Sequence, residues 1–229
     1  MNIFKELTIG CHKAGTPIIQ GGMGVRISLS GLASAVANEG GIGVIATAGI
    51  GLNEKDSFTN YIEANIRALK NEIRKARENT KGLLAINILG VLSNYSDMVK
   101  TAISEGIDII FSGAGLPLNL PEFLKKSDKT AIVPIVSSAR AAKIITEKWI
   151  SNYDYIPDAF VVEGPLAGGH LGFKSEQITD KSYSLEKIVS DVLTEVKKFE
   201  EKLKKSIPVI AAGGIYSGAD IFKFFKLGA

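Results

Sequence analysis

Short apolar runs alternate with amphipathic segments along most of this chain. The runs have the length of buried strands, and they predict strands at residues 17–20, 43–46, 83–87, 107–111, 131–136, 159–162 and 208–211. Apolar residues at helical spacing predict helices at residues 30–39, 54–77, 95–105, 121–126, 139–149, 185–204 and 219–227. Strands that are apolar throughout are typical of a parallel sheet that helical crossovers cover on both faces.

The spacing of these elements predicts the fold class. Seven strand–helix units in 229 residues favour an α/β fold of the TIM (β/α) barrel type over an open doubly wound sheet. A closed barrel has eight strands, and neither the eighth strand nor helices beyond it follow residue 229. We therefore expect a single domain over residues 1–229 that is C-terminally truncated. An open barrel exposes strand edges, so a homo-oligomer that covers them is a further expectation.

Glycines and small polar residues gather where the predicted strands end. Both parallel architectures bind ligands at the carboxyl ends of their strands. The residues expected there are 21–24, Asn87, 113–115, 137–138, 163–172 and 212–215. A single glycine is explained by an ordinary turn, but repetition around the ring favours a ligand site.

His170 is the strongest candidate for proton transfer. It lies in the glycine-rich loop 163–172, where glycines permit close approach of a ligand. An unperturbed histidine titrates near neutrality and so can accept or donate a proton. A lone histidine is more often structural, but its position after a buried strand favours the functional interpretation. We expect the other histidine, His12, to lie on the surface.

Two further strand ends suggest ligand contacts. The amide of Asn87 offers donors and an acceptor that suit the edge of a flat heterocycle, although a capping role is equally open; Gln20 is similar. Gly213 and Gly214 follow the seventh strand and precede a helix. Backbone N–H groups there, aided by the helix dipole, favour phosphate binding over a plain tight turn.

Composition and charge argue against several classes of function. The net charge of +3 is spread over helices that also carry acids, and Lys197 to Lys205 alternates with glutamates, so neither a nucleic-acid stripe nor a polyanion site is indicated. The single cysteine, Cys11, forms no internal disulfide. We find no signal peptide, membrane span, zinc-ligand cluster, P-loop or nucleophile elbow. A cytoplasmic protein is expected.

Five motifs in order resemble the nitronate monooxygenase family, formerly called 2-nitropropane dioxygenases, and the related flavin-dependent enoyl-acyl-carrier-protein reductases. They are the segments 17–23 (PIIQGGM), 85–87 (AIN), 112–115 (SGAG), 168–172 (GGHLG) and 208–215 (PVIAAGGI). The resemblance spans nearly the whole chain. It implies a TIM barrel that holds FMN.

The resemblance also implies roles for individual residues. Residues 21–23 (Gly21, Gly22 and Met23) would lie against the flavin, and Asn87 would contact it. Gly168 and Gly169 would let the cofactor approach, and Gly213 and Gly214 would bind its phosphate. Glu163 and Ala212, which open these last two loops, complete the expected cofactor site. His170 would act as a general base or an orienting group near the substrate; no metal is expected.

The reaction expected from the resemblance is oxidation of alkyl nitronates by O₂ through FMN. One alternative is reduction of enoyl thioesters, in which NAD(P)H reduces FMN. Residues 132–138 are more similar to the reductases, and Ile135 stands where many monooxygenases have lysine. A second alternative is a non-catalytic or incomplete barrel that binds flavin weakly. A phosphosugar isomerase lacks a suitably placed acid–base pair.

Overall fold

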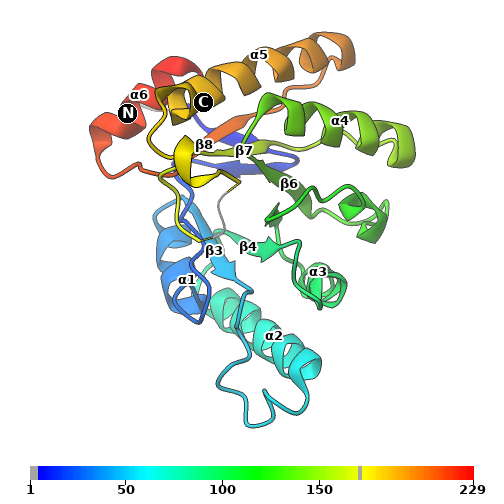
Figure 1. Cartoon of the computed structure of the whole chain (residues 1–229). Coiled ribbons are helices and arrows are strands. Elements are labelled where there is room, and N and C mark those ends of the chain that lie inside the picture. Colours follow the sequence, from blue (N-terminus) through cyan, green and yellow to red (C-terminus); the bar gives the residue numbers. More distant parts are fainter. Residues whose placement is uncertain (1–4, 170–171) are drawn as a thin grey trace. The chain divides into compact units, whose positions relative to one another are not determined.

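The computed structural model describes residues 5–169 and 172–229 and divides into two compact units. Unit 1 comprises Met1–Gly115 and Glu122–Ile132, and unit 2 comprises Leu116–Pro121 and Val133–Ala229. In both units strands alternate with helices along the chain (Figure 1). The predicted α/β class with parallel strands is therefore confirmed.

Unit 1 contains a small hairpin and a parallel sheet. The hairpin pairs β1 (Leu7–Ile9) with β2 (His12–Ala14), and the sequence pattern did not predict it. The parallel strands are β3 (Ile42–Ala46), β4 (Leu83–Leu89) and β5 (Ile109–Gly113), in that order. Every residue of β3 and β5 is buried, as the continuous apolar runs predict.

Three helices cover the sheet of unit 1. They are α1 (Ser30–Asn38), α2 (Tyr61–Asn79) and α3 (Tyr95–Ser104). Helices α1 and α3 pack on the strands, and α2 packs against both helices. The helix expected at 121–126 is only a short 3₁₀ helix, η1 (Leu120–Phe123).

Unit 2 repeats this construction. The strand β6 (Ala131–Val136) leads from unit 1 into unit 2 and is followed by β7 (Phe160–Glu163) and β8 (Val209–Ala212), which run parallel in the order β6–β7–β8. The helices are α4 (Ala139–Tyr153), α5 (Leu185–Leu203) and α6 (Gly218–Leu227), with two 3₁₀ turns, η2 (Ser175–Gln177) and η3 (Lys181–Tyr183).

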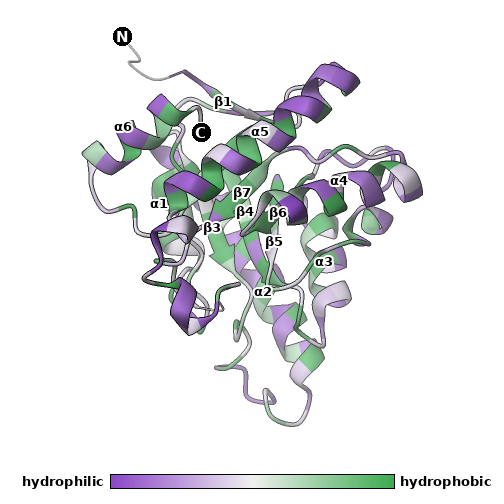
Figure 2. Ribbon diagram, turned by 45° about the horizontal axis from the view of Figure 1, so that its top comes forward, coloured by the Kyte–Doolittle hydropathy of each residue, from purple (hydrophilic) through white to green (hydrophobic). Residues whose placement is uncertain are grey.

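Helix α5 organises unit 2, because it contacts β7, β8, α4 and α6. Its buried residues recur at helical spacing: Leu185, Ile188, Val189, Val192 and Val196. Its outer face is polar, as the alternating colours of α5 in Figure 2 show. The strands carry the apolar residues, so each unit has its own buried core.

The strand predicted at 17–20 is reduced to a single parallel bridge between Ile19 and Ile42. The side chain of Gln20 explains this. Its amide nitrogen donates to the Val44 carbonyl at 3.0 Å, and its oxygen accepts from the Val44 N–H at 3.2 Å. A side chain thus takes the place of the next backbone pairs. Seven strands were predicted, and six parallel strands and this bridge are observed in the described residues.

The helix expected from residue 54 begins only at Tyr61. Residues 54–60 form turns instead, and Arg67 on α2 forms ion pairs with Glu54 and Asp56. At the start of α2, Tyr61 and Ile62 are 39% and 44% exposed. The buried face carries Leu69 and Ile73 together with small residues, among them Ala64, Ala68 and Ala76, which allow close packing.

Helix α1 begins at Ser30, as predicted. Its N-cap residue is Leu29, which provides no side-chain cap. The backbone N–H of Ser30 donates to the buried carboxylate of Glu72 on α2 at 3.0 Å, and the Ser30 hydroxyl donates to the same oxygen. Glu72 therefore fixes the start of α1 from a neighbouring helix.

The contact between α1 and β3 generates a stability prediction. A β-carbon at Gly43 would lie 1.8 Å from the Ala33 carbonyl oxygen of α1, which is backbone and cannot turn aside. Gly43→Ala should lower the free energy of unfolding by about 3 kcal/mol or more. Gly31→Ala, on the same helix with open space around it, should raise it by roughly 0.5–1 kcal/mol. Urea unfolding of both variants checks this; equal stability of the two would contradict the packing.

Candidate functional site

Two predicted groups of residues meet in unit 1. A β-carbon added at Gly22 would lie 2.6 Å from Asn87 Cβ and 3.1 Å from Asn87 Cγ. The loop after the Ile19 bridge therefore lies directly on the Asn87 side chain, and only glycine permits this contact. Gly21 has open space around it, and Met23 is 51% exposed. The structure thus places Gly22 on Asn87, with Gly21 and Met23 as the chain neighbours of Gly22; contact of these residues with a flavin stays a prediction.

Asn87 lies two residues before the end of β4, slightly earlier than the predicted strand end. Its backbone carbonyl accepts from the N–H and the hydroxyl of Thr47 at 3.0 and 3.1 Å. Its half-buried side-chain amide has no hydrogen-bond partner among the described residues. The backbone of Asn87 is therefore held in place, while its side-chain amide is available to bind a ligand with donor and acceptor atoms. Gln20, in contrast, is satisfied by Val44 and is structural.

Ser28 holds the loop of unit 1 in shape, and sequence reasoning did not identify it. Its buried hydroxyl accepts from the Met23 N–H at 3.0 Å and donates to the Gly21 carbonyl at 3.3 Å. Its N–H donates to the Met23 carbonyl. A serine among apolar residues just before a helix suggests a cap, so the local pattern gave no sign of this contact across the loop.

The remaining predicted cofactor residues meet in unit 2. Gly213 and Gly214 follow β8 with φ angles of +96° and +73°, in the left-handed region that favours glycine. A β-carbon at Gly213 would lie 2.9 Å from Ala167 Cβ, and one at Gly214 would lie 2.9 Å from Leu166 Cβ. The turn after β8 thus packs against the loop after β7, next to the exposed residues Gly168 and Gly169.

The start of α6 differs from the expected phosphate cradle. The Ser217 hydroxyl accepts from the Asp220 N–H, and the Asp220 carboxylate accepts from the N–H groups of Tyr216 and Ser217. Hydrogen bonds from Ser217 hold the pKa of Asp220 below its usual range, which keeps a negative charge at this helix end. The helix dipole is therefore already compensated, and phosphate donors would have to come from the glycine turn itself.

Glu163 is the last residue of β7, and it pairs in register with Ala212 of β8. Its half-buried carboxyl has no partner among the described residues. Burial raises the pKa of Glu163. A raised pKa extends to higher pH the protonated form of the carboxyl group, which can donate a hydrogen bond to a ligand as well as accept one.

His170, the predicted catalytic residue, lies outside the described residues, so its role stays a prediction. The described ends of its loop are well defined: Gly169 has φ +86°, and a β-carbon at Gly172 would lie 2.6 Å from Ser137 Oγ. His12 is half-buried rather than fully exposed, and its Nε2 lies 2.8 Å from the Lys129 carbonyl oxygen.

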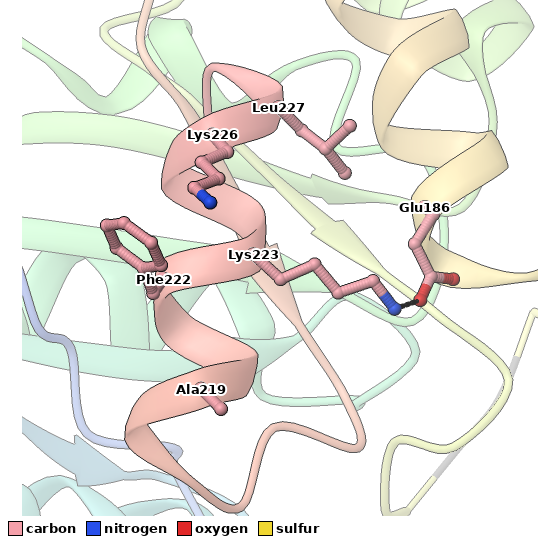
Figure 3. A pocket seen from close by; sticks show the side chains of 6 residues that line it. All are labelled: Glu186, Ala219, Phe222, Lys223, Lys226 and Leu227. Carbon is pink, nitrogen blue, oxygen red and sulfur yellow. Dashed lines mark hydrogen bonds and ion pairs between the residues drawn. The ribbon is translucent and has the colours of Figure 1, made fainter.

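A surface hollow on unit 2 contains none of the predicted residues. It lies between α6 and the start of α5 and is lined by Glu186, Ala219, Phe222, Lys223, Lys226 and Leu227. Figure 3 shows Lys223 paired with Glu186 across it, while Lys226 lies over the Phe222 ring, 4.5 Å from its centroid. Both cations are thus engaged, and we do not assign this hollow to the candidate site.

In residues 5–169 and 172–229, no group of three or more histidine, cysteine, aspartate or glutamate side chains is arranged to hold a metal ion. No helix within these ranges is both long enough and apolar enough to cross a membrane.

Parallel strands, helical crossovers and glycine-lined loops at strand ends define an α/β protein of the class that binds ligands at the carboxyl ends of its strands. The sequence model of the family described as nitronate monooxygenase matches residues 5–229. The chain belongs to this family, which confirms the resemblance seen in the motifs.

Two curated relatives carry the same name, (3aS,4S,5R,7aS)-5-hydroxy-7a-methyl-1-oxo-octahydro-1H-indene-4-carboxyl-CoA dehydrogenase. The protein from Mycobacterium tuberculosis is 27% identical over 213 residues, and the one from Rhodococcus jostii is 25% identical over the same length. The match covers 93% of this chain and 49% of each relative. The chain thus spans about half the length of these relatives.

Solved structures are similar as well. FabK from Thermotoga maritima is 28% identical with a TM-score of 0.67, over 93% of this chain and 55% of that one. Nitroalkane oxidase from Streptomyces ansochromogenes has a TM-score of 0.70 at 20% identity, over 93% of this chain and 62% of that one. At that identity the second likeness supports the fold alone.

The buried carboxyl of Glu163 predicts a pH-dependent stability. Since its pKa is raised in the folded protein, its contribution is fully present below the pKa of an unfolded glutamate and is lost as the pH rises through the folded value. Glu163→Gln removes the ionisation, so it should be more stable than the wild type at pH 7 and lose that advantage at pH 4. Urea unfolding at both pH values checks this. A pH-independent difference would mean that the carboxyl is not desolvated.

Proposed function

We propose that this chain is an FMN-dependent oxidoreductase that oxidises alkyl nitronates with O₂. Membership of the nitronate monooxygenase family supports the proposal. The observation that carries it is the contact in unit 1, where Gly22 lies on Asn87, whose side-chain amide has no hydrogen-bond partner in the part of the chain that the structure describes. A glycine surface beside a free amide suits a flat heterocycle whose edge has both donors and acceptors.

The described residues of each unit, taken by itself, suit one part of FMN. In unit 1, Gly21, Gly22 and Met23 would lie along the ring system, with Asn87 at its edge. In unit 2, the phosphate would be held by backbone N–H groups of the turn at Gly213 and Gly214, for which none of the described residues acts as an acceptor. The cofactor residues of unit 2 are Glu163, Gly168, Gly169, Ala212, Gly213 and Gly214.

When bound, FMN would supply the electron transfer between the organic substrate and O₂. The chain would supply binding and proton control. His170 would remove the α-proton when the substrate is a neutral nitroalkane. Glu163, whose pKa is raised by burial, would contribute a hydrogen-bonding carboxyl group to the cofactor site. The complete barrel as one domain over residues 1–229, a homo-oligomer and a cytoplasmic location stay predictions.

A second candidate is an oxidoreductase of acyl thioesters, including the predicted enoyl-acyl-carrier-protein reductase that uses NAD(P)H. Both curated relatives are named as dehydrogenases of a carboxyl-CoA. Their identities of 27% and 25% exceed the 20% of the nitroalkane oxidase. The two candidates differ in which compound reduces the flavin.

Flavin absorbance distinguishes these candidates. The chain is mixed with FMN under anaerobic conditions and then given NAD(P)H or propyl 2-nitronate. Bleaching by the nitronate, with O₂ consumption on readmission of air, is the expected result. Bleaching of the flavin by NAD(P)H, followed by reoxidation of the reduced flavin by an enoyl thioester, would favour the second candidate. A flavin that does not bind would support the non-catalytic alternative.

The Gly22–Asn87 contact predicts a loss of cofactor binding. In Gly22→Ala the added methyl group would collide with Asn87 Cβ and displace the loop from the strand end. FMN affinity should fall at least tenfold, with a smaller effect on stability. Quenching of flavin fluorescence measures the affinity, and Gly31→Ala on α1 is the control that should bind as the wild type does. Unchanged affinity in Gly22→Ala would place the flavin elsewhere.

The proposed base predicts a selective effect at position 170. His170→Asn should lower kcat/KM for neutral 2-nitropropane by about 100-fold, while turnover of the preformed nitronate changes by only a few-fold. Steady-state O₂ consumption with both forms of the substrate checks this. Equal losses on the two forms would exclude proton abstraction by His170.

A further inference from the structure

The backbone of the loop at residues 21–28 in unit 1 is strained at two residues that carry a β-carbon. Val25 and Arg26 have φ angles of +45° and +67°. The left-handed region is unfavourable for any residue with a β-carbon, and a β-branched valine there is an outlier. Such a conformation is unfavourable and persists only where the surroundings enforce it.

Hydrogen bonds to the segment after β3 enforce this conformation. The Val25 N–H donates to the Ala48 carbonyl at 2.7 Å. The Arg26 guanidinium donates to the carbonyl of the buried residue Ile50, also at 2.7 Å. A β-carbon at Gly24 would lie 3.0 Å from Ala48 Cβ, so the two segments are in close contact. The loop is therefore fixed to its neighbour rather than free in solvent.

The fixed loop exposes apolar side chains to solvent. Met23, Val25 and Ile27 are 51%, 63% and 62% exposed, while Ser28 is buried. Leu52, from the segment after β3, is 44% exposed. Its Cδ1 and the Cγ1 of Val25 lie 3.0 and 3.4 Å from the position of a β-carbon on Gly49, so the two side chains flank that glycine. We call these four residues the apolar platform.

The platform adjoins the candidate cofactor residues. Met23 belongs to both groups, and Gly22 beside it contacts Asn87. Arg26 donates one hydrogen bond to the Ile50 carbonyl, which holds its side chain toward the segment after β3. A rigid apolar surface next to a site for a reactive heterocycle suits the hydrocarbon part of a substrate.

We propose that the apolar platform of Met23, Val25, Ile27 and Leu52 binds the hydrocarbon chain of the substrate, so that the chain acts on long or bulky apolar substrates in preference to short ones. This inference rests on the proposed oxidoreductase function, and it names the substrate class that either candidate reaction would take. A polar substituent on the hydrocarbon would be disfavoured, because it would lose its hydration without gaining a partner.

The test uses Val25→Asn in the FMN-loaded chain. Asparagine adopts the left-handed conformation more readily than valine, so this variant keeps the loop and should be at least as stable as the wild type. Its side chain is polar, so the platform loses the apolar surface at position 25. Leu52→Ser is the second variant. Phe58→Ser is the matched control, because Phe58 is 92% exposed and apolar but lies outside the platform.

The measurement is kcat/KM for straight-chain primary nitronates of three to eight carbons. In the wild type it should rise about threefold for each methylene that reaches the platform. In Val25→Asn and Leu52→Ser the ratio between the eight-carbon and three-carbon substrates should fall about tenfold or more. Phe58→Ser should retain the wild-type ratio. A wild-type ratio in both platform variants would overturn the inference.

A binding series separates this inference from the proposed function. Calorimetry measures the affinity of butanoate, hexanoate and octanoate for the same proteins, with no turnover needed. If no nitronate is oxidised but octanoate binds tightly to the wild type and weakly to Val25→Asn, the proposed reaction fails and the platform stands. If affinity does not depend on chain length, the platform fails. If Val25→Asn only changes the oligomeric state in light scattering, the surface is a contact between copies and the inference is overturned.

Discussion

Close approach of one backbone segment to another at glycine positions is the constraint on which both units depend. A β-carbon at Gly43 would overlap the α1 backbone, and one at Gly82 would lie 2.3 Å from the Ala37 carbonyl oxygen. The same kind of contact shapes the predicted ligand residues within each unit. Gly22 rests on Asn87 in unit 1, and Gly213 rests on Ala167 in unit 2. The residues that allow the helices to pack on the strands and those that shape the ligand surfaces thus obey one steric rule.

Much of this fold follows from local sequence. The continuous apolar runs at β3, β6 and β7 predict buried parallel strands, because a strand that helices cover on both faces exposes none of its side chains to water. The failures have particular causes. At residues 17–20 the Gln20 side chain replaces backbone pairing with Val44, and no periodicity reveals that substitution. The hairpin of β1 and β2 has strands of three residues each, too short for any alternation to be recognised.

The candidate site was predictable in its residues but not in its contacts. Glycine and asparagine at strand ends marked Gly22, Asn87, Gly213 and Gly214, since parallel strands present their carboxyl ends to ligands. Which of them meet depends on packing over long sequence separations. The sequence also gave no sign that Asp220 occupies the start of α6, where its carboxylate takes the place of an external anion. The strain at Val25 was equally hidden, because hydrogen bonds to Ala48 and Ile50 impose it.

The most direct test of the account is equilibrium binding of FMN to the unmodified chain. A titration that monitors the quenching of flavin fluorescence measures this binding. The account predicts one FMN per chain, with displacement by neither riboflavin nor inorganic phosphate alone at equal concentration, because both the ring and the phosphate of FMN contribute to binding. Absence of saturable binding, or riboflavin binding as tightly as FMN, would contradict the claim that these glycine contacts form a cofactor site.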